Sequence, residues 1–270
     1  MQGGQLLVVI IDTPDSNRSQ PLIRSLGSDS RFNVVRLPAC MLNAYSDVDA
    51  KNIEVNLETF QFFQGREMSP QEIGCATSHN RARHLLANSL IGGVVLEDDA
   101  RITDVDSFYT TAIKFLKNQS GALSILSMNE FRASSSLAFN KEGSQRLLGT
   151  PFLAVSYAAT PIAAETLCTA NEPIRTVSDW PRTRIKYFSL YKPLILHEGN
   201  NGLSTIDVAR ELNRRGLTIT KKLAQFSFIP FFVSKPINTS LNTYIFEVYW
   251  SRVTWHIDSL IRRFLKGVYR

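Results

Sequence analysis

Several patterns that mark common protein classes are absent from this chain of 270 residues. It has only three cysteines, Cys40, Cys75 and Cys168, which are widely spaced and form no C-x-x-C pair. Zinc-binding and disulfide-rich domains need closely spaced or paired cysteines, so the sequence favours neither class. We therefore expect a reduced, cytosolic compartment. Glycosylation sequons occur, for example at 17–19 and 118–120, but they are used only on a secretory route, which we do not expect here.

Long hydrophobic runs are missing as well. The apolar run at 6–11 has no basic segment before it and is too short for a signal peptide. The aromatic run at 226–233 is interrupted by Pro230 and is too short to span a bilayer. What remains is an ordinary globular composition, 44% hydrophobic and 20% charged, enough for one large or two modest domains.

The first 220 residues carry no excess charge, because the formal net charge of +6 comes from the end of the chain. Residues 221–270 hold eight Lys and Arg against two acids. Within this segment, the apolar residues between 257 and 268 recur at the spacing of one helix face. Arg262 and Arg263 fall outside that face. This pattern is typical of a basic amphipathic helix on an anionic membrane surface, and equally of a helix docked on the main domain. No recognised motif supports nucleic-acid binding, so no nucleic-acid partner is expected.

The most informative stretch is GVVLEDDAR at 93–101, an apolar run that leads into Glu97, Asp98 and Asp99. The run is typical of a buried strand, most simply a parallel one. Three adjacent carboxylates repel one another, so they either lie in a solvated turn or surround a cation. Ligands of open α/β sheets bind beyond the carboxyl ends of the strands, where these acids would lie. Because hard divalent ions bind carboxylates and phosphates together, we interpret the stretch as a metal–diphosphate site.

A second candidate segment follows the first predicted strand, at 6–11. The polar turn after it begins with Asp12 and ends with Arg18, and a helix is expected from 19 to 26. The loop after the first strand of a parallel sheet commonly binds nucleotides. Arg18 there can pair with a phosphate or a carboxylate, or it can be a solvated arginine at the start of a helix.

A helix is predicted over 70–88, because Ser69 and Glu72 form a capping box in front of it. His79 lies on the apolar face of this helix, which points inward, whereas Arg83 and its basic neighbours lie mostly on other faces. A lone buried histidine is either a hydrogen-bonded structural residue or a direct participant in catalysis. The helix leads into the strand that ends in the three acids.

Two further residues are candidates for chemistry. Asp179, in VSDWP at 177–181, is a candidate general base beside an aromatic platform for a sugar, or else the cap of the next turn. His197 ends a strand and is either a metal ligand from a distant part of the chain or an exposed strand-end histidine. The remaining predicted elements are strands at 33–37, 122–126, 152–158, 185–190 and 194–196, helices at 108–116 and 161–170, and a surface loop at 129–146.

Two blocks of sequence together resemble glycosyltransferase family 25. They are GREMSPQEIGCATSH at 65–79 and, after a helix of ordinary length, VVLEDD at 94–99. The family includes bacterial lipooligosaccharide sugar transferases and collagen galactosyltransferases. The resemblance covers about residues 6–206, and the opening strand, the polar turn and Arg18 fit it. The segment around Asp179 matches only loosely.

The resemblance implies an α/β protein of GT-A type over residues 1–220: a Rossmann-like nucleotide-binding sheet joined to an acceptor-binding half. It implies inverting transfer of a sugar, most often galactose, from a UDP-sugar donor. The acceptor would be lipooligosaccharide, lipopolysaccharide or another glycan. A divalent metal, Mn²⁺ or Mg²⁺, would be held by Asp99 and Asp98 with His197 completing the coordination.

The same resemblance assigns roles to the other candidates. Donor binding falls to Asp12, Arg18, His79 and Asp98, and catalysis to Asp179 as the base with Glu97. The tail at 221–270 lies outside the resemblance; if it binds membrane, it would keep a cytoplasmic enzyme on the inner face of the inner membrane, near a glycolipid acceptor. The alternatives are a transferase fold that no longer catalyses, or a non-catalytic peripheral membrane or nucleic-acid-binding protein. Metal-dependent UDP binding is expected of the enzyme and not of the non-catalytic protein.

Overall fold

The architecture comes from a computed structural model. It describes residues 5–14, 17–64, 66–127, 144–147, 154–177, 185–190 and 193–197, together with Pro181 and Thr183. The proposed base Asp179, most of the expected loop at 129–146 and the whole tail at 221–270 lie outside these residues. The expected division at residue 220 therefore stays a prediction. Among the described helices, none is both long enough and apolar enough to cross a bilayer.

A seven-stranded, mostly parallel sheet forms the centre of the protein, with the order β2-β1-β3-β7-β5-β8-β6. Strands β1, β2 and β3 are parallel, as the apolar run before the acids predicted, and β8 is parallel to β5. β7 and β6 run in the opposite direction. The strands are β1 Leu6–Asp12, β2 Phe32–Pro38, β3 Gly93–Glu97, β5 Ala122–Ile125, β6 Ser144–Leu147, β7 Ser156–Ala159 and β8 Lys186–Leu190. The result is a mixed α/β fold of Rossmann-like character.

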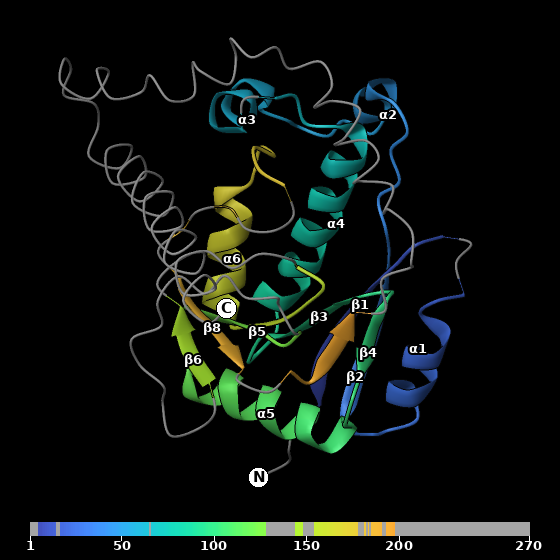
Figure 1. Ribbon diagram of the computed structural model, residues 1–270, viewed down its shortest axis with the longest axis vertical. Coiled ribbons are helices and arrows are strands. Elements are labelled where there is room, and N and C mark those ends of the chain that lie inside the picture. Colours follow the sequence, from blue (N-terminus) through green and yellow to red (C-terminus); the bar gives the residue numbers. More distant parts are fainter. Residues whose placement is uncertain are drawn as a thin grey trace, which may run out of the picture.

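Helices cover both faces of the sheet, which explains why the central strands β1 and β3 are nearly continuous apolar runs. Along β1, Val8 and Ile10 pack toward α1 and α5, whereas Val9 and Ile11 pack toward α4 and α6. In Figure 1, α4 and α6 lie above the sheet and α5 lies below it. The helices are α1 Gln20–Gly27, α4 Pro70–Ala87, α5 Val105–Asn118 and α6 Pro161–Ala170.

The segment before α4 forms a small second cluster, which the sequence pattern did not predict. Helices α2 (Tyr45–Ala50) and α3 (Leu57–Gln64) gather around the first turns of α4, away from the sheet (Figure 1). Phe60, Met68 and Ile73 are fully buried there. Both helices are short, with six and eight residues, so neither shows a long enough period to be recognised from sequence.

The capping box predicted for α4 is present. The Oγ atom of Ser69 accepts from the Glu72 amide at 3.3 Å, and Glu72 Oε2 accepts from the Ser69 amide at 3.0 Å. Arg66 donates both of its terminal nitrogens to the Glu72 carboxylate, at 2.7 and 2.6 Å. Because Glu72 is only 1% exposed, this ion pair compensates a carboxylate that would otherwise be costly to bury. The start of α4 is therefore held in place.

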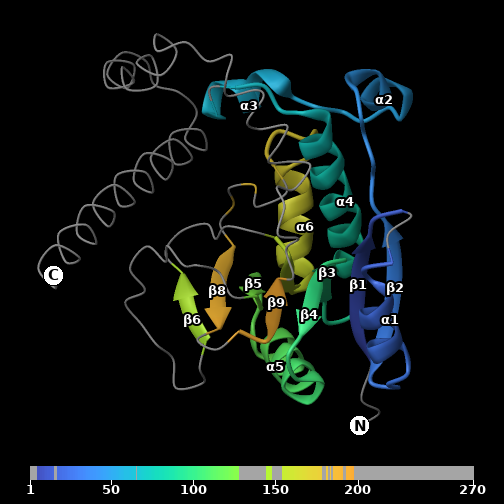
Figure 2. The same ribbon diagram turned by 45° about the vertical axis from the view of Figure 1, so that its right-hand side comes forward.

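A small two-stranded ribbon lies beside the main sheet. β4 (Ala100–Ile102) follows the three acids directly and pairs antiparallel with β9 (Ile195–His197), and Figure 2 shows the two strands side by side. In this register Ala100 faces His197. The sequence predicted β9 but not β4, because three residues after an acidic turn show no period of their own.

One prediction about the loops is partly wrong. The segment 129–146 was expected to be a surface loop throughout, but its last residues belong to β6, which pairs antiparallel with β8 at the edge of the sheet. The pairing uses backbone groups, so a polar composition does not prevent it. Because the residues of the segment are mostly polar, its sequence did not indicate this strand.

Candidate active site

The candidate site lies where the order of the sheet reverses. From β1 the chain passes to β2 on one side, and β3 then enters on the other side of β1. In this register Ile11 of β1 faces Glu97 of β3, so the two strands end together. The loop that carries Arg18 and the turn formed by Asp98 and Asp99 therefore leave the sheet at adjacent points. Ligands of open α/β sheets bind in the crevice at such a switch point.

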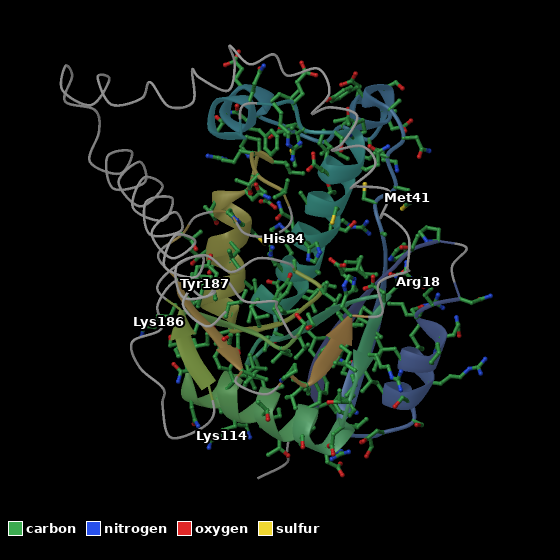
Figure 3. All side chains as sticks on the ribbon, in the orientation of Figure 1. Arg18, Met41, His84, Lys114, Lys186 and Tyr187 are labelled. Carbon is green, nitrogen blue, oxygen red and sulfur yellow. The ribbon has the colours of Figure 1, made fainter. Side chains whose placement is uncertain are left out.

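Arg18 forms ion pairs with the acidic turn. Its Nη2 atom lies 2.7 Å from Asp99 Oδ2 and 3.8 Å from Asp98 Oδ1. Figure 3 labels this arginine on the loop between β1 and α1. The Arg18 side chain is 39% exposed, whereas those of Asp98 and Asp99 are 8% and 13% exposed. The guanidinium therefore approaches a largely buried pair of carboxylates from the solvent side and neutralises part of their charge.

His197 reaches the same acid from the other direction. Its Nε2 atom lies 2.9 Å from Asp99 Oδ2, and its side chain is 40% exposed. The β4–β9 ribbon causes this contact, because pairing Ala100 with His197 brings the histidine next to residue 99. Asp99 thus shares one carboxylate oxygen between an arginine and a histidine.

The other carboxylate oxygen of Asp99 provides a test for a metal. Asp99 Oδ1 is buried and has no hydrogen-bond partner among the described residues. Burial and the charge of Glu97 raise the pKa of Asp99, and the positive charges of His197 and Arg18 offset this only in part. A carboxylate that is costly to ionise and has an unused buried oxygen is suited to a cation. The carboxylates of Asp98 and Asp99 are the oxygen ligands that Mn²⁺ and Mg²⁺ prefer. The ligand atoms of Asp98, Asp99 and His197 do not all lie within 4.8 Å of one another, so coordination by all three needs a side-chain movement.

Glu97 has a partner of its own. His79 Nε2 lies 3.0 Å from Glu97 Oε1, and His79 Nδ1 lies 3.3 Å from the hydroxyl of Tyr157. Burial acts to raise the pKa of Glu97, but the hydrogen bond and charge of His79, with the charges of His197 and Arg18, outweigh it and lower that pKa. His79 is 1% exposed, so it lies behind the acids as a hydrogen-bonded buried histidine. Glu97 is thereby held in its ionised form.

Asp12 is at the expected edge, but its carboxylate contacts protein groups. It accepts hydrogen bonds from the hydroxyl of Ser19 and from the guanidinium of Arg36. Only 7% of Asp12 is exposed. Since Ser19 directly follows Arg18, these bonds anchor the loop that carries the arginine to the end of β1.

Sequence reasoning missed or misplaced three residues that surround the site. Arg83 was predicted to lie mostly off the buried face of α4, yet it is fully buried. Its guanidinium lies 5.7 Å from the ring centroid of Tyr157, and its Nη1 atom lies 3.2 Å from Asn80 Oδ1. The prediction was wrong because α6 and the sheet cover α4 on more than one side. Tyr157 left a signal, a tyrosine within an otherwise small and apolar strand, whereas nothing in the sequence pointed to Arg36.

Comparison with known proteins complements this geometry. No curated protein matches the chain with significant similarity. The sequence model of glycosyltransferase family 25, described as an LPS biosynthesis protein, matches residues 22–180. The matched segment contains α4 and the three acids, but neither Arg18 nor His197, which only the fold brings to them. Because the match covers more than half of the 270 residues, this chain belongs to glycosyltransferase family 25.

Proposed function

We propose that this glycosyltransferase moves galactose, with inversion, from a UDP-sugar to a lipooligosaccharide or lipopolysaccharide acceptor with the help of a divalent metal. The observation that carries the proposal is the meeting of Arg18, Asp98, Asp99 and His197 at the switch point of the sheet. Three separate segments of the chain supply these groups. A solvated acidic turn would have no need of an arginine and a histidine from elsewhere.

The chemistry requires stabilisation of a departing diphosphate. Mn²⁺ or Mg²⁺ bound by Asp99, Asp98 and His197 would neutralise the negative charge that grows on the diphosphate as the bond to the sugar breaks. Arg18, on the solvent side of the same acids, would donate to a phosphate oxygen of the donor. Its contact with Asp99 keeps the guanidinium at the place where the phosphate would arrive.

The residues behind the acids would position them. His79 donates to Glu97 and keeps that carboxylate ionised and oriented, so its part in donor binding would be indirect. Asp12 would act in the same way, through the Ser19 contact that anchors the Arg18 loop. The proton of the acceptor hydroxyl has to be removed as that hydroxyl attacks the sugar. Asp179 is our candidate for this base, and it lies in the segment matched by the family.

Nucleotide binding tests the proposal most directly. We expect UDP-galactose to raise the melting temperature of the protein when Mn²⁺ or Mg²⁺ is present, and EDTA to remove most of the increase. UDP-glucose, UDP-N-acetylglucosamine and GDP-mannose compare the donors in the same assay. If no nucleotide sugar changed the melting temperature with either metal, the non-catalytic alternative would be preferred.

The tail extends the proposal to the acceptor. If the acceptor is a glycolipid, its headgroup lies at a membrane surface, and residues 221–270, with their net charge of +6, would hold the enzyme there. We expect the full-length protein to sediment with vesicles that contain phosphatidylglycerol and to remain in solution with phosphatidylcholine alone. Replacing Arg262 and Arg263 by glutamate should weaken the first interaction. Equal sedimentation of this variant and the wild type would contradict a role for the basic face.

A further inference from the structure

A group of side chains whose atoms are metal-ligand types lies directly behind the acidic turn. The group consists of Cys75, His79 and Glu97. Each offers one ligand atom, and these three atoms lie within 4.8 Å of one another. Cys75 and His79 are four residues apart on α4, so both point from the same side of the helix. Glu97 ends β3 and faces them, with Oε1 at 3.0 Å from His79 Nε2. This group includes neither Asp98, Asp99 nor His197.

The chemistry of these three ligands differs from that of the acidic turn. Thiolate, imidazole and carboxylate together suit Zn²⁺, whereas Mg²⁺ and Mn²⁺ prefer oxygen ligands. Ligands of a tetrahedral zinc site lie about 2.0–2.3 Å from the ion and hence roughly 3.5 Å from one another. Here His79 Nε2 and Glu97 Oε1 lie 3.0 Å apart and the three ligand atoms lie within 4.8 Å of one another, so shifts of about 1 Å would reach that spacing.

Another group, formed by His84, Cys168 and Glu172, satisfies the same distance criterion but is less suitable. Burial raises the pKa of the Cys168 thiol to about 12, so the thiolate that a metal needs is scarce at neutral pH. His84, labelled in Figure 3, and Glu172 have side chains that are 51% and 47% exposed, whereas that of His79 is 1% exposed, so this second group is less enclosed. Cys75 is partly exposed, whereas Cys168 is buried.

We propose that Cys75, His79 and Glu97 form a binding site for a zinc-class cation, with the fourth position open to water or another ligand. The ion would link α4 to the end of β3 and would replace the hydrogen bond between His79 and Glu97. Because Glu97 adjoins Asp98, the same ion would also inhibit sugar transfer. The inhibition rests on the proposed function, whereas the binding does not.

Cobalt titration of the full-length protein tests the binding. Co²⁺ that replaces Zn²⁺ at a thiolate ligand produces a sulfur-to-cobalt charge-transfer band in the near ultraviolet. The acidic turn holds no sulfur, so the band does not report on metal bound by Asp99. We expect the wild type to show one band that Zn²⁺ displaces. Cys75→Ser should lose it, and Cys40→Ser, a change at an equally half-buried thiol, should keep it.

A measurement on the wild type covers the case in which Cys75→Ser does not fold. Zn²⁺ should slow the alkylation of Cys75 by iodoacetamide at least tenfold, as read by peptide mass spectrometry, and leave Cys40 unaffected. The proposal is overturned if the wild type shows no charge-transfer band, if a band persists in folded Cys75→Ser, or if the band depends on Cys168. Unaltered alkylation of Cys75 in saturating Zn²⁺ would overturn it as well. None of these outcomes depends on UDP-sugar binding.

Discussion

His197 Nε2 lies 2.9 Å from Asp99 Oδ2, although 98 residues separate the two in the chain. The short ribbon of β4 and β9 produces this contact, because its register places Ala100 opposite His197. The Asp99 oxygen that contacts His197 also contacts Arg18, which comes from the loop after β1. The acidic turn thus becomes a point where three separate segments of the chain meet.

Replacing Asp99 by asparagine removes the negative charge of the side chain and keeps its size. We expect Asp99→Asn to lower sugar transfer by about a hundredfold or more, the scale seen for other electrostatic stabilisers, while the fold stays intact. Transfer to an acceptor glycan and circular dichroism measure the two effects. The matched control is Asp106→Asn on α5, whose side chain is 82% exposed. Wild-type activity in Asp99→Asn would contradict the proposed metal site.

The same variant has a predicted effect on stability. The pKa of Asp99 is raised in the folded state, so the carboxylate destabilises the fold once the pH exceeds that pKa. The neutral amide avoids this cost. We therefore expect metal-free Asp99→Asn to unfold at a higher urea concentration than the metal-free wild type at neutral pH, although it is less active. A lower unfolding midpoint would show that the contacts with Arg18 and His197 outweigh the burial of the charge.

Arg18 should compete with the metal and assist the donor. Its guanidinium lies 2.7 Å from Asp99, so removing it relieves repulsion of an incoming cation. For Arg18→Met we expect Mn²⁺ binding to tighten about fivefold, corresponding to roughly 1 kcal/mol for charges at such distances in water. UDP-galactose binding should weaken in the presence of Mn²⁺. Calorimetry measures both, and Arg24→Met, an exposed arginine of α1, is the control. Unaltered Mn²⁺ affinity would place Arg18 outside the metal site.

Replacing two helical glycines, Gly74 and Gly27, by alanine should change the free energy of unfolding in opposite directions. A Cβ atom at Gly74 of α4 would lie 2.2 Å from the carbonyl oxygen of Cys40, so α4 has to move. We expect Gly74→Ala to lower the free energy of unfolding by about 1–3 kcal/mol. A Cβ atom at Gly27 of α1 meets nothing within 4 Å, and Gly27→Ala should add about 0.4–1 kcal/mol. Urea denaturation measures both, and equal midpoints would contradict the close approach at Gly74.

Stability should fall in alkaline solution because two buried groups resist ionisation. Burial raises the pKa of Cys168 from 9.0 to about 12 and that of Tyr157 from 10.0 to about 12. In the unfolded chain these groups lose their protons first. Their contribution to stability is therefore complete below about pH 9 and is lost as the pH rises toward 12, by roughly 1.4 kcal/mol per pH unit for each group.

The pH series of urea denaturation curves checks this expectation in Cys168→Ala. Between about pH 9 and pH 10 the thiol accounts for most of the effect, so this variant should lose about 1 kcal/mol less than the wild type over that interval. Cys40→Ala, at a half-buried thiol, serves as the control for the loss of a cysteine. An identical slope in Cys168→Ala and the wild type would rule out the thiol as the source.

Much of the scaffold could be predicted because its signals are local. The apolar run of β1 and the capping box of α4 lie within a few consecutive residues, and both predictions are confirmed. Burial was harder to infer. Arg83 was expected mostly off the buried face, and its burial depends on α6, which follows it in the chain by about eighty residues. The short elements α2, α3 and β4 gave too little periodicity to be found.

The position of three carboxylates after a buried strand can be read from the chain alone, because these residues are covalent neighbours and the apolar run before them is stable only when it is buried. The same local patterns indicate the helix before that strand and the block at 65–79 that resembles the family. Which groups contact Glu97 and Asp99 depends on the fold: Arg18 and His197 contact Asp99, and His79 contacts Glu97. Those pairings depend on strand order and register, which arise from backbone hydrogen bonds between distant segments and leave no pattern along the chain.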